Sequence, residues 1–100
     1  MAIIEDPEEI EKITLHQMVD FRDRQILEIG CGNGRLTWRY ADQSAHVTAI
    51  DPDEEEIKNA RATLPDRLKD RVSFAATKID DFARSAGDRS FDIALFAWSL

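Results

Sequence analysis

The chain has 100 residues, with 13 Lys and Arg against 20 Asp and Glu, and a formal net charge of −7. A hydrophobic content of 43% with 33% charged residues indicates a single globular domain and argues against disorder. The negative charge disfavours nucleic-acid binding, no apolar run is long enough to span a membrane, and a single cysteine excludes an internal disulfide. We expect a cytoplasmic protein without nucleic-acid or membrane partners.

The first predicted element is a helix from Asp6 to Phe21. Asp6 is a suitable N-cap, Pro7 suits the first helical position, and the acids that follow favour the positive end of the helix dipole. Apolar residues at helical spacing supply a face that can be buried. We predict that residues 1–24 form an N-terminal helix and turn, and that residues 25–100 form a single, incomplete domain.

Four short segments rich in apolar and β-branched residues are predicted to be strands, and helical segments separate them. A parallel sheet connected by right-handed crossovers is the usual result of such alternation. The predicted fold class is therefore α/β, a doubly wound parallel sheet with helices on both faces. The predicted strands are Gln25–Ile29, His46–Ile50, Val72–Ala76 and Phe91–Trp98, and the predicted helical segments between them are Arg35–Ala41, a helix opened by Asp53 and ended by Pro65, and a turn from Asp80 to Ser85.

The fourth predicted strand, Phe91–Trp98, is almost continuously apolar, as expected for a strand buried on both faces. Such a strand needs a following helix or strand to cover it, and uncovered it would be an adhesive edge. We therefore expect the sequence to be the N-terminal portion of a longer protein, truncated after the fourth strand. A self-contained four-stranded domain is the alternative.

The most informative feature is a glycine-rich turn between two acidic residues. A strand carrying Glu28 runs into Gly30-Cys31-Gly32-Asn33-Gly34, and the next strand is followed by Asp51. Glycines permit positive φ and let a ligand approach the backbone closely. A carboxylate at the end of the second strand can accept hydrogen bonds from both hydroxyls of a ribose. The unit predicts a nucleoside-containing ligand at the carboxyl edge of the sheet.

The stretch LEIGCGNG, followed by AIDPD, resembles the S-adenosylmethionine-dependent methyltransferases of the Rossmann-like class. The dinucleotide fingerprint would need a third glycine at position 35, which is Arg35 here. The resemblance extends from about residue 8 to residue 100, and VSFAATKIDDF and SFDIALFAWSL follow in the expected order. It implies a Rossmann-like fold with strand order 3-2-1-4 and S-adenosylmethionine as the cofactor.

The resemblance also implies roles for particular residues. Glu28 would lie near the ammonium group of the methionine moiety, directly or through water. The backbone of the glycine turn would line that moiety, with its amides near the carboxylate. Asp51 would hold the ribose, Pro52 would pack near the adenine, and Ala97 would border the methyl-transfer site. The turn residues concerned are Gly30, Cys31, Gly32 and Gly34.

The adenine contact departs from the family's pattern. The family often places an acid after the third strand, and that position is Lys78 here, beside Thr77. A lysine cannot accept a hydrogen bond from the adenine amino group. Thr77, a backbone carbonyl or Asp80 would have to serve instead.

The implied reaction is methyl transfer to an oxygen, nitrogen, carbon or sulfur nucleophile, most simply on a small molecule. The leaving thioether is neutral, so the protein's contribution is alignment of the reacting groups and exclusion of water. No catalytic residue is identified and no metal site is expected. This fragment alone is expected to be inactive, and the oligomeric state is not predicted. The alternatives are an NAD-dependent oxidoreductase and a non-catalytic nucleoside-binding module.

Overall fold

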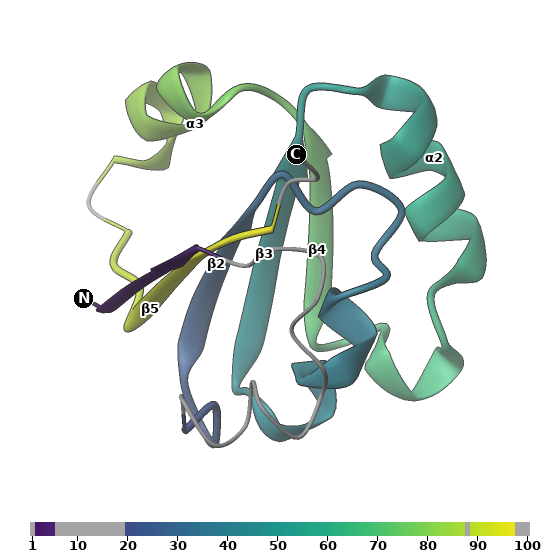
Figure 1. Ribbon diagram of the computed structural model, residues 1–100, viewed down its shortest axis with the longest axis vertical. Helices are drawn as coiled ribbons and strands as arrows, with labels where there is room; N and C mark the ends of the chain where they lie inside the picture. Colours follow the sequence, from purple (N-terminus) through teal and green to yellow (C-terminus); the bar gives the residue numbers. More distant parts are fainter. Residues whose placement is uncertain (1, 6–19, 88, 98–100) are drawn as a thin grey trace.

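The computed structural model describes residues 2–5, 20–87 and 89–97. Five parallel strands form one sheet in the order β1-β5-β2-β3-β4 (Figure 1). The four predicted strands stand in the predicted order 3-2-1-4 within it, which confirms the Rossmann-like arrangement. The strands are β1 (Ala2–Glu5), β2 (Gln25–Ile29), β3 (His46–Asp51), β4 (Val72–Ala76) and β5 (Ile93–Phe96).

The edge strand β1 is absent from the sequence prediction. It pairs in parallel with β5, with Ala2 opposite Ile93 and Glu5 opposite Phe96. Four residues are too few to show a period-two pattern, and this pairing joins segments far apart in the sequence, so sequence periodicity carries no sign of it. The helix predicted from Asp6 lies outside the described residues except for Asp20 and Phe21, which are not helical.

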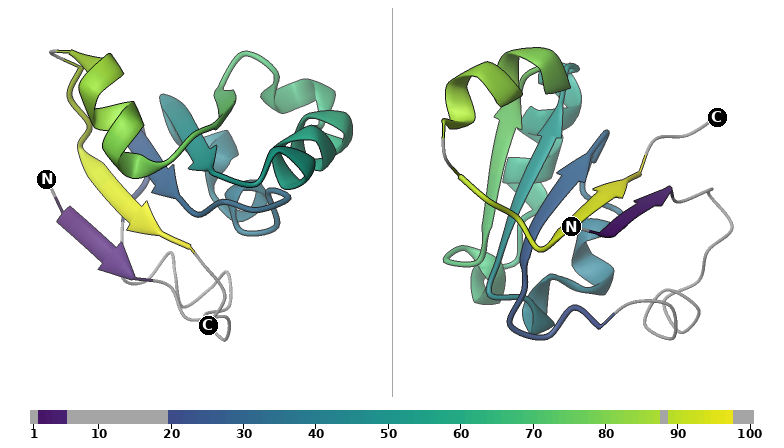
Figure 2. Two further views of the ribbon diagram at one scale, coloured as in Figure 1. Left: turned by 90° about the horizontal axis from the view of Figure 1, so that it is seen from above. Right: turned by 90° about the vertical axis from the view of Figure 1, so that its left-hand side faces the viewer.

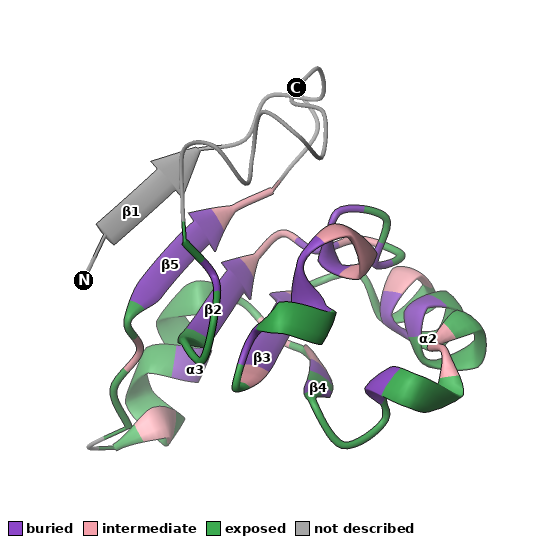
Figure 3. Cartoon of the chain, turned by 90° about the horizontal axis from the view of Figure 1, so that it is seen from below, coloured by how far each residue is buried: buried purple, intermediate pink, exposed green. Residues whose placement is uncertain are grey.

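Helical segments lie on both faces of the sheet, as predicted. α2, η1 and η2 cover one face and α3 covers the other (Figure 2). The larger core cluster, which includes Tyr40, Ile57 and Phe74, lies on the α2 face, and a smaller cluster of Leu27, Ile50 and Phe82 lies between the sheet and α3. Figure 3 shows buried residues along the strands β2, β3 and β5. The bounds are η1 (Thr37–Arg39), η2 (Ala41–Gln43), α2 (Glu54–Thr63), η3 (Asp66–Leu68) and α3 (Ile79–Ala86).

The helix α2 begins where the sequence predicts, because Asp53 caps it. The Asp53 carboxylate accepts hydrogen bonds from the backbone amides of Glu55 at 2.9 Å and Glu56 at 3.2 Å. Ile57 and Ala60 are buried against the sheet and fix the rotation of the helix about its axis. The cap and the buried pair together decide which first-turn side chains face the carboxyl edge of the sheet.

The segment after the glycine turn differs from the prediction. The sequence predicts one helix over Arg35–Ala41, whereas the structure has the two short 3-10 helices η1 and η2. Thr37, Trp38 and Tyr40 are weak helix formers, and Tyr40 has φ −135° and ψ −14°, which interrupts helical geometry. No α-helix therefore opens directly above the turn in the part of the chain described here, and a helix dipole cannot serve a ligand at that point.

Candidate functional site

A cavity of about 340 Å³ lies at the carboxyl ends of β2, β3 and β5. Its volume falls within the range of small-molecule sites. Five predicted site residues line it: Gly30, Cys31, Gly32, Asp51 and Ala97. The other lining residues are Asn33, Arg35, Leu36, Asp53 and Glu56.

The backbone of the glycine turn has a conformation that residues with a Cβ atom rarely adopt. Gly30, Gly32 and Gly34 have φ of 78°, 56° and 91°. The amides of Gly30 and Cys31 donate to the carbonyl of Ile50 at 2.8 and 3.1 Å, which ties the turn to the end of β3. The Gly34 amide donates to the Cys31 carbonyl at 3.1 Å. These amides donate to carbonyls of the chain itself, and their predicted place near a ligand carboxylate stays a prediction.

The Asp51 carboxylate joins the turn to the start of α2. Oδ2 accepts a hydrogen bond from the Gly32 amide at 3.0 Å, and Oδ1 accepts one from the Asp53 amide at 2.8 Å. Each carboxylate oxygen has more than one acceptor site, so both oxygens keep capacity for ligand hydroxyls on the cavity side. The two backbone contacts fix the orientation of the carboxylate.

Glu28 lies beneath the turn, outside the cavity lining. Its side chain is completely buried, and its Oε1 accepts hydrogen bonds from Thr37 Oγ1 at 2.9 Å and from the Tyr40 hydroxyl. Thr37 and Tyr40 are also completely buried. In this structure Glu28 holds the segment that follows the turn against β2. Sequence spacing alone could not distinguish this position from one that faces the ligand.

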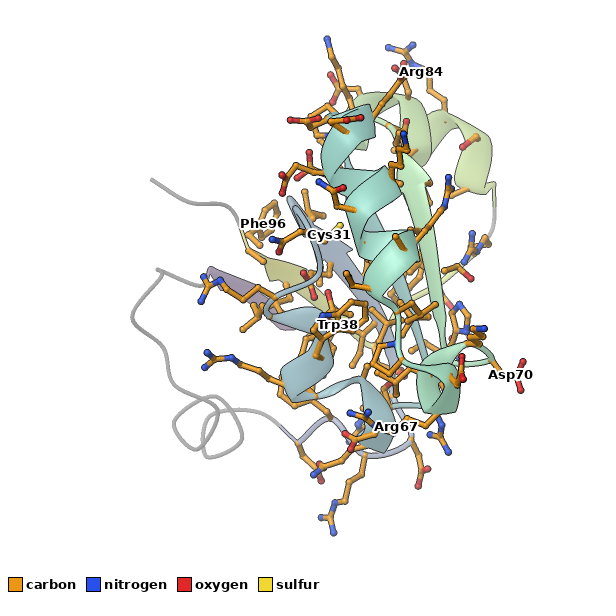
Figure 4. All side chains as sticks on the ribbon, turned by 90° about the vertical axis from the view of Figure 1, so that its right-hand side faces the viewer. Cys31, Trp38, Arg67, Asp70, Arg84 and Phe96 are labelled. Carbon is orange, nitrogen blue, oxygen red and sulfur yellow. The ribbon has the colours of Figure 1, made fainter. Side chains whose placement is uncertain are left out.

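Cys31 also lines the cavity, beside the glycines. Burial raises the pKa of its thiol, and the negative charges of Glu28, Asp51 and Glu56 raise it further. A thiol with a raised pKa stays protonated near neutral pH and is a poor nucleophile. The side chain therefore serves packing within the turn. In Figure 4, Cys31 and Phe96 lie toward the same end of the molecule, and Arg67 and Asp70 lie toward the other end.

Gly34 is buried against the indole of Trp38. A Cβ added at this glycine would stand 2.5 Å from Cζ2 of Trp38, where no real Cβ can remain. Trp38 in turn packs edge-on against Phe74, with ring centroids 5.8 Å apart. Gly34 is thus required for packing beneath the turn, and it is not among the residues that line the cavity.

We expect Gly34→Ala to lower the free energy of unfolding by about 2–4 kcal/mol, from the contact with Trp38 and from the strained positive φ. Urea denaturation measures the loss. In a Trp38→Leu background the same substitution should cost less, because the smaller side chain relieves the contact. An equal loss in both backgrounds would mean that backbone strain alone is responsible.

The predicted adenine residues lie near the cavity without lining it. The Thr77 amide donates to the Asp51 carbonyl at 3.0 Å, which places the end of β4 beside the end of β3. Pro52 and Lys78 are exposed, and the Thr77 hydroxyl donates to the Lys78 carbonyl at 3.3 Å. The hydroxyl oxygen of Thr77 retains acceptor capacity.

Ala97 reaches the cavity because its amide donates to the Ile29 carbonyl at 2.8 Å, next to the start of the turn. Sequence reasoning missed Arg35, Asp53 and Glu56 as lining residues. In the sequence, Asp53 and Glu56 indicate only the start of a helix, and Arg35 indicates only that the third glycine of a dinucleotide site is missing.

None of the helices in the described residues is long and apolar enough to cross a membrane. No group of three or more His, Cys, Asp or Glu side chains in those residues is arranged to hold a metal ion.

Comparison with known proteins gives a family match. The family model described as a methyltransferase domain matches residues 26–100. The chain is 33% identical over 87 residues to the ubiquinone biosynthesis O-methyltransferase of Rickettsia typhi, and the match covers 86% of this chain and 33% of that protein. The chain therefore spans about a third of the length of this curated relative.

Solved structures give a consistent result. The plantazolicin methyltransferase BpumL in complex with S-adenosylhomocysteine (SAH) matches with a TM-score of 0.62 and 28% identity, covering 82% of this chain and 30% of that one. A cyclopropane-fatty-acyl-phospholipid synthase-like protein from Lactobacillus casei matches with a TM-score of 0.66 and 28% identity, covering 85% and 35%.

Proposed function

This chain belongs to the methyltransferase domain family, and on that basis we propose that it forms the cofactor-binding part of an S-adenosylmethionine-dependent methyltransferase. The cofactor is S-adenosylmethionine, which supplies a methyl group made electrophilic by its positively charged sulfur. The acceptor is proposed to be a small molecule, and the cytoplasm is the proposed location. Residues 25–100 are proposed as the binding domain.

The observation that carries the proposal is the cavity formed by the glycine turn and Asp51. The turn exposes backbone without Cβ atoms at Gly30 and Gly32, so a ligand can approach closely. Asp51 presents a carboxylate that backbone amides hold in place. A ribose with two hydroxyls suits such an acceptor. The residues present therefore fit an adenosyl ligand.

Further contacts are assigned by chemistry. Arg35 lines the cavity, and a guanidinium suits the carboxylate of the methionine moiety, since the amides of Gly30, Cys31, Gly32 and Gly34 donate within the protein. Ala97 borders the reacting end, where a small side chain leaves room for an acceptor. Pro52, Thr77 and Lys78 are proposed to flank the adenine, with the Thr77 hydroxyl as an acceptor for its amino group. Glu28 and Gly34 support the turn from below.

Equilibrium binding tests the proposal against the nicotinamide alternative. We expect the protein to bind S-adenosylmethionine and SAH, and to bind NAD at least about 100-fold more weakly, because Arg35 stands where a dinucleotide site needs its third glycine. Isothermal titration calorimetry with the three ligands measures this difference. Binding of NAD without binding of SAH would contradict the proposal.

A further inference from the structure

Glu56 reaches the cavity from the first turn of α2. Its backbone amide donates to the Asp53 carboxylate at 3.2 Å, and the neighbouring Ile57 is buried in the core. With the helix held in this rotation, Glu56 is half-buried and lines the cavity, whereas Glu54 and Glu55 in the same turn are exposed. The position of Glu56 is thus set by the fold, and its two acidic neighbours face solvent.

The Glu56 carboxylate lies close to the backbone of Gly32. Its Oε2 is 3.2 Å from the point where a Cβ on Gly32 would stand. The amide of the same glycine donates to Asp51 Oδ2 at 3.0 Å. Two carboxylates therefore flank one residue of the turn. In the described part of the chain, no cationic side chain forms an ion pair with either of them.

The charge of Glu56 acts at the turn itself. It contributes to the raised pKa of the Cys31 thiol, after burial and the charges of Glu28 and Asp51. A negative potential that disfavours a thiolate favours a cation in the same place. Cys31 is buried and Asp51 and Glu56 are half-buried, so interactions among these groups are less screened than interactions between fully exposed charges.

We infer that Glu56 makes the cavity selective for the charged methyl donor over its neutral product. This inference rests on the proposed function and deepens it. S-adenosylmethionine and SAH share the adenosine and the amino-acid group, and they differ by the transferred methyl group and the positive charge on sulfur. The Glu56 carboxylate lines the cavity, and its charge attracts the positive sulfur of the donor, a charge that the product lacks. Because methyl transfer removes this charge, the cavity binds the product more weakly, which favours product release.

The test compares Glu56→Gln with Glu55→Gln. Both substitutions remove one negative charge from the first turn of α2, and Glu55 is exposed and outside the cavity lining. Calorimetry is performed at low salt with three ligands: S-adenosylmethionine, SAH and sinefungin, in which a carbon bearing an amine replaces the charged sulfur. Thermal unfolding of both variants checks that the fold is retained.

We expect Glu56→Gln to weaken the binding of S-adenosylmethionine and of sinefungin by about fivefold, because one partly screened charge interaction is lost. The affinity for SAH should change by less than about twofold. Glu55→Gln should change the affinity for each ligand by less than about twofold. Added salt should reduce the fivefold effect.

Three results would overturn the inference. Equal weakening of all three ligands would mean that Glu56 contacts their shared part, and unchanged binding of all three would mean that its charge does not reach the sulfur. Equal effects of Glu56→Gln and Glu55→Gln on affinity would mean that Glu56 acts only through the net charge of the protein. Failure of the unmodified protein to bind any of the ligands would instead contradict the proposed function, and this inference with it.

Discussion

Replacing Asp51 with alanine should weaken the binding of S-adenosylmethionine by about 1.5–4 kcal/mol, or roughly 10- to 1000-fold, the value of one or two charge-assisted hydrogen bonds. The proposed ribose would lose its acceptor. The amides of Gly32 and Asp53 would also lose their shared partner, which would loosen the turn and the start of α2. Calorimetry measures the affinity, and circular dichroism measures any loss of stability separately.

Asp42→Ala is the matched control for Asp51→Ala. Asp42 is an exposed carboxylate in η2, just before β3 begins, so it lies at the amino end of the strand that Asp51 ends. This control should leave the affinity within about twofold of the unmodified protein, since exposed charges at such distances are largely screened. Unchanged affinity in Asp51→Ala itself would show that the ribose is held elsewhere.

The second large effect is expected on stability, at the buried carboxylate of Glu28. Tyr40→Phe removes one of the two hydroxyl groups that donate to Oε1, in a site where all three side chains are completely buried. We expect the free energy of unfolding to fall by about 1.5–3 kcal/mol, the usual range for a hydrogen bond to a charged group. Urea denaturation measures the change.

A double-mutant cycle identifies the source of this loss. In a Glu28→Gln background, Tyr40→Phe should cost about half as much or less, because the acceptor no longer carries a charge. Thr37→Val, which removes the other hydroxyl, should show the same dependence on Glu28. A full loss in the Gln background would assign the cost to packing of the Tyr40 ring, which stacks on Phe21 with ring centroids 4.5 Å apart.

The pH dependence of stability gives a second measure of the same contact. Burial raises the pKa of Tyr40 well above its ordinary value near 10, and the charge of Glu28 and the hydrogen bond to it raise that pKa further. The unfolded chain therefore releases this proton at a lower pH than the folded protein does. The contribution of Tyr40 to stability should be complete below about pH 10 and fall above it, by up to about 1.4 kcal/mol per pH unit.

The raised pKa of Cys31 adds a similar decline that begins near its ordinary value of 9. In Tyr40→Phe the tyrosine contribution should disappear and the cysteine contribution should remain. Denaturation midpoints measured from pH 7 to 11 separate the two. Identical alkaline slopes in the variant and the unmodified protein would contradict this assignment.

Local signals made much of the fold predictable. The strand at Val72–Ala76 has the predicted bounds, and α2 begins after Asp53, because β-branched runs and N-caps act over a few residues. The 3-10 geometry after the turn and the pairing of β1 with β5 depend on tertiary contacts that no short window contains. β5 is also shorter than predicted, since Phe91 lies outside the strand and packs instead near Phe82.

The candidate site was predictable in part for the same reason. Glycines in a turn after a strand, and an acid at the end of the next strand, are local features. Whether a side chain faces the cavity depends on the rotation of its helix about the helix axis, or on which face of the sheet its strand position points to. Glu28 and Glu56 show the consequence. Glu28 lies below the turn, whereas Glu56, which the sequence predicts only as an acid in the first turn of a helix, lines the cavity.

The two backbone contacts of Asp51 have a consequence for how quickly and how completely a ligand is accommodated. Folding has already immobilised the carboxylate between Gly32 and Asp53, so binding loses little side-chain entropy there. The acceptor is preorganised before any adenosyl compound arrives. Association at this end of the cavity should therefore proceed in one kinetic phase, without a slow rearrangement of the turn.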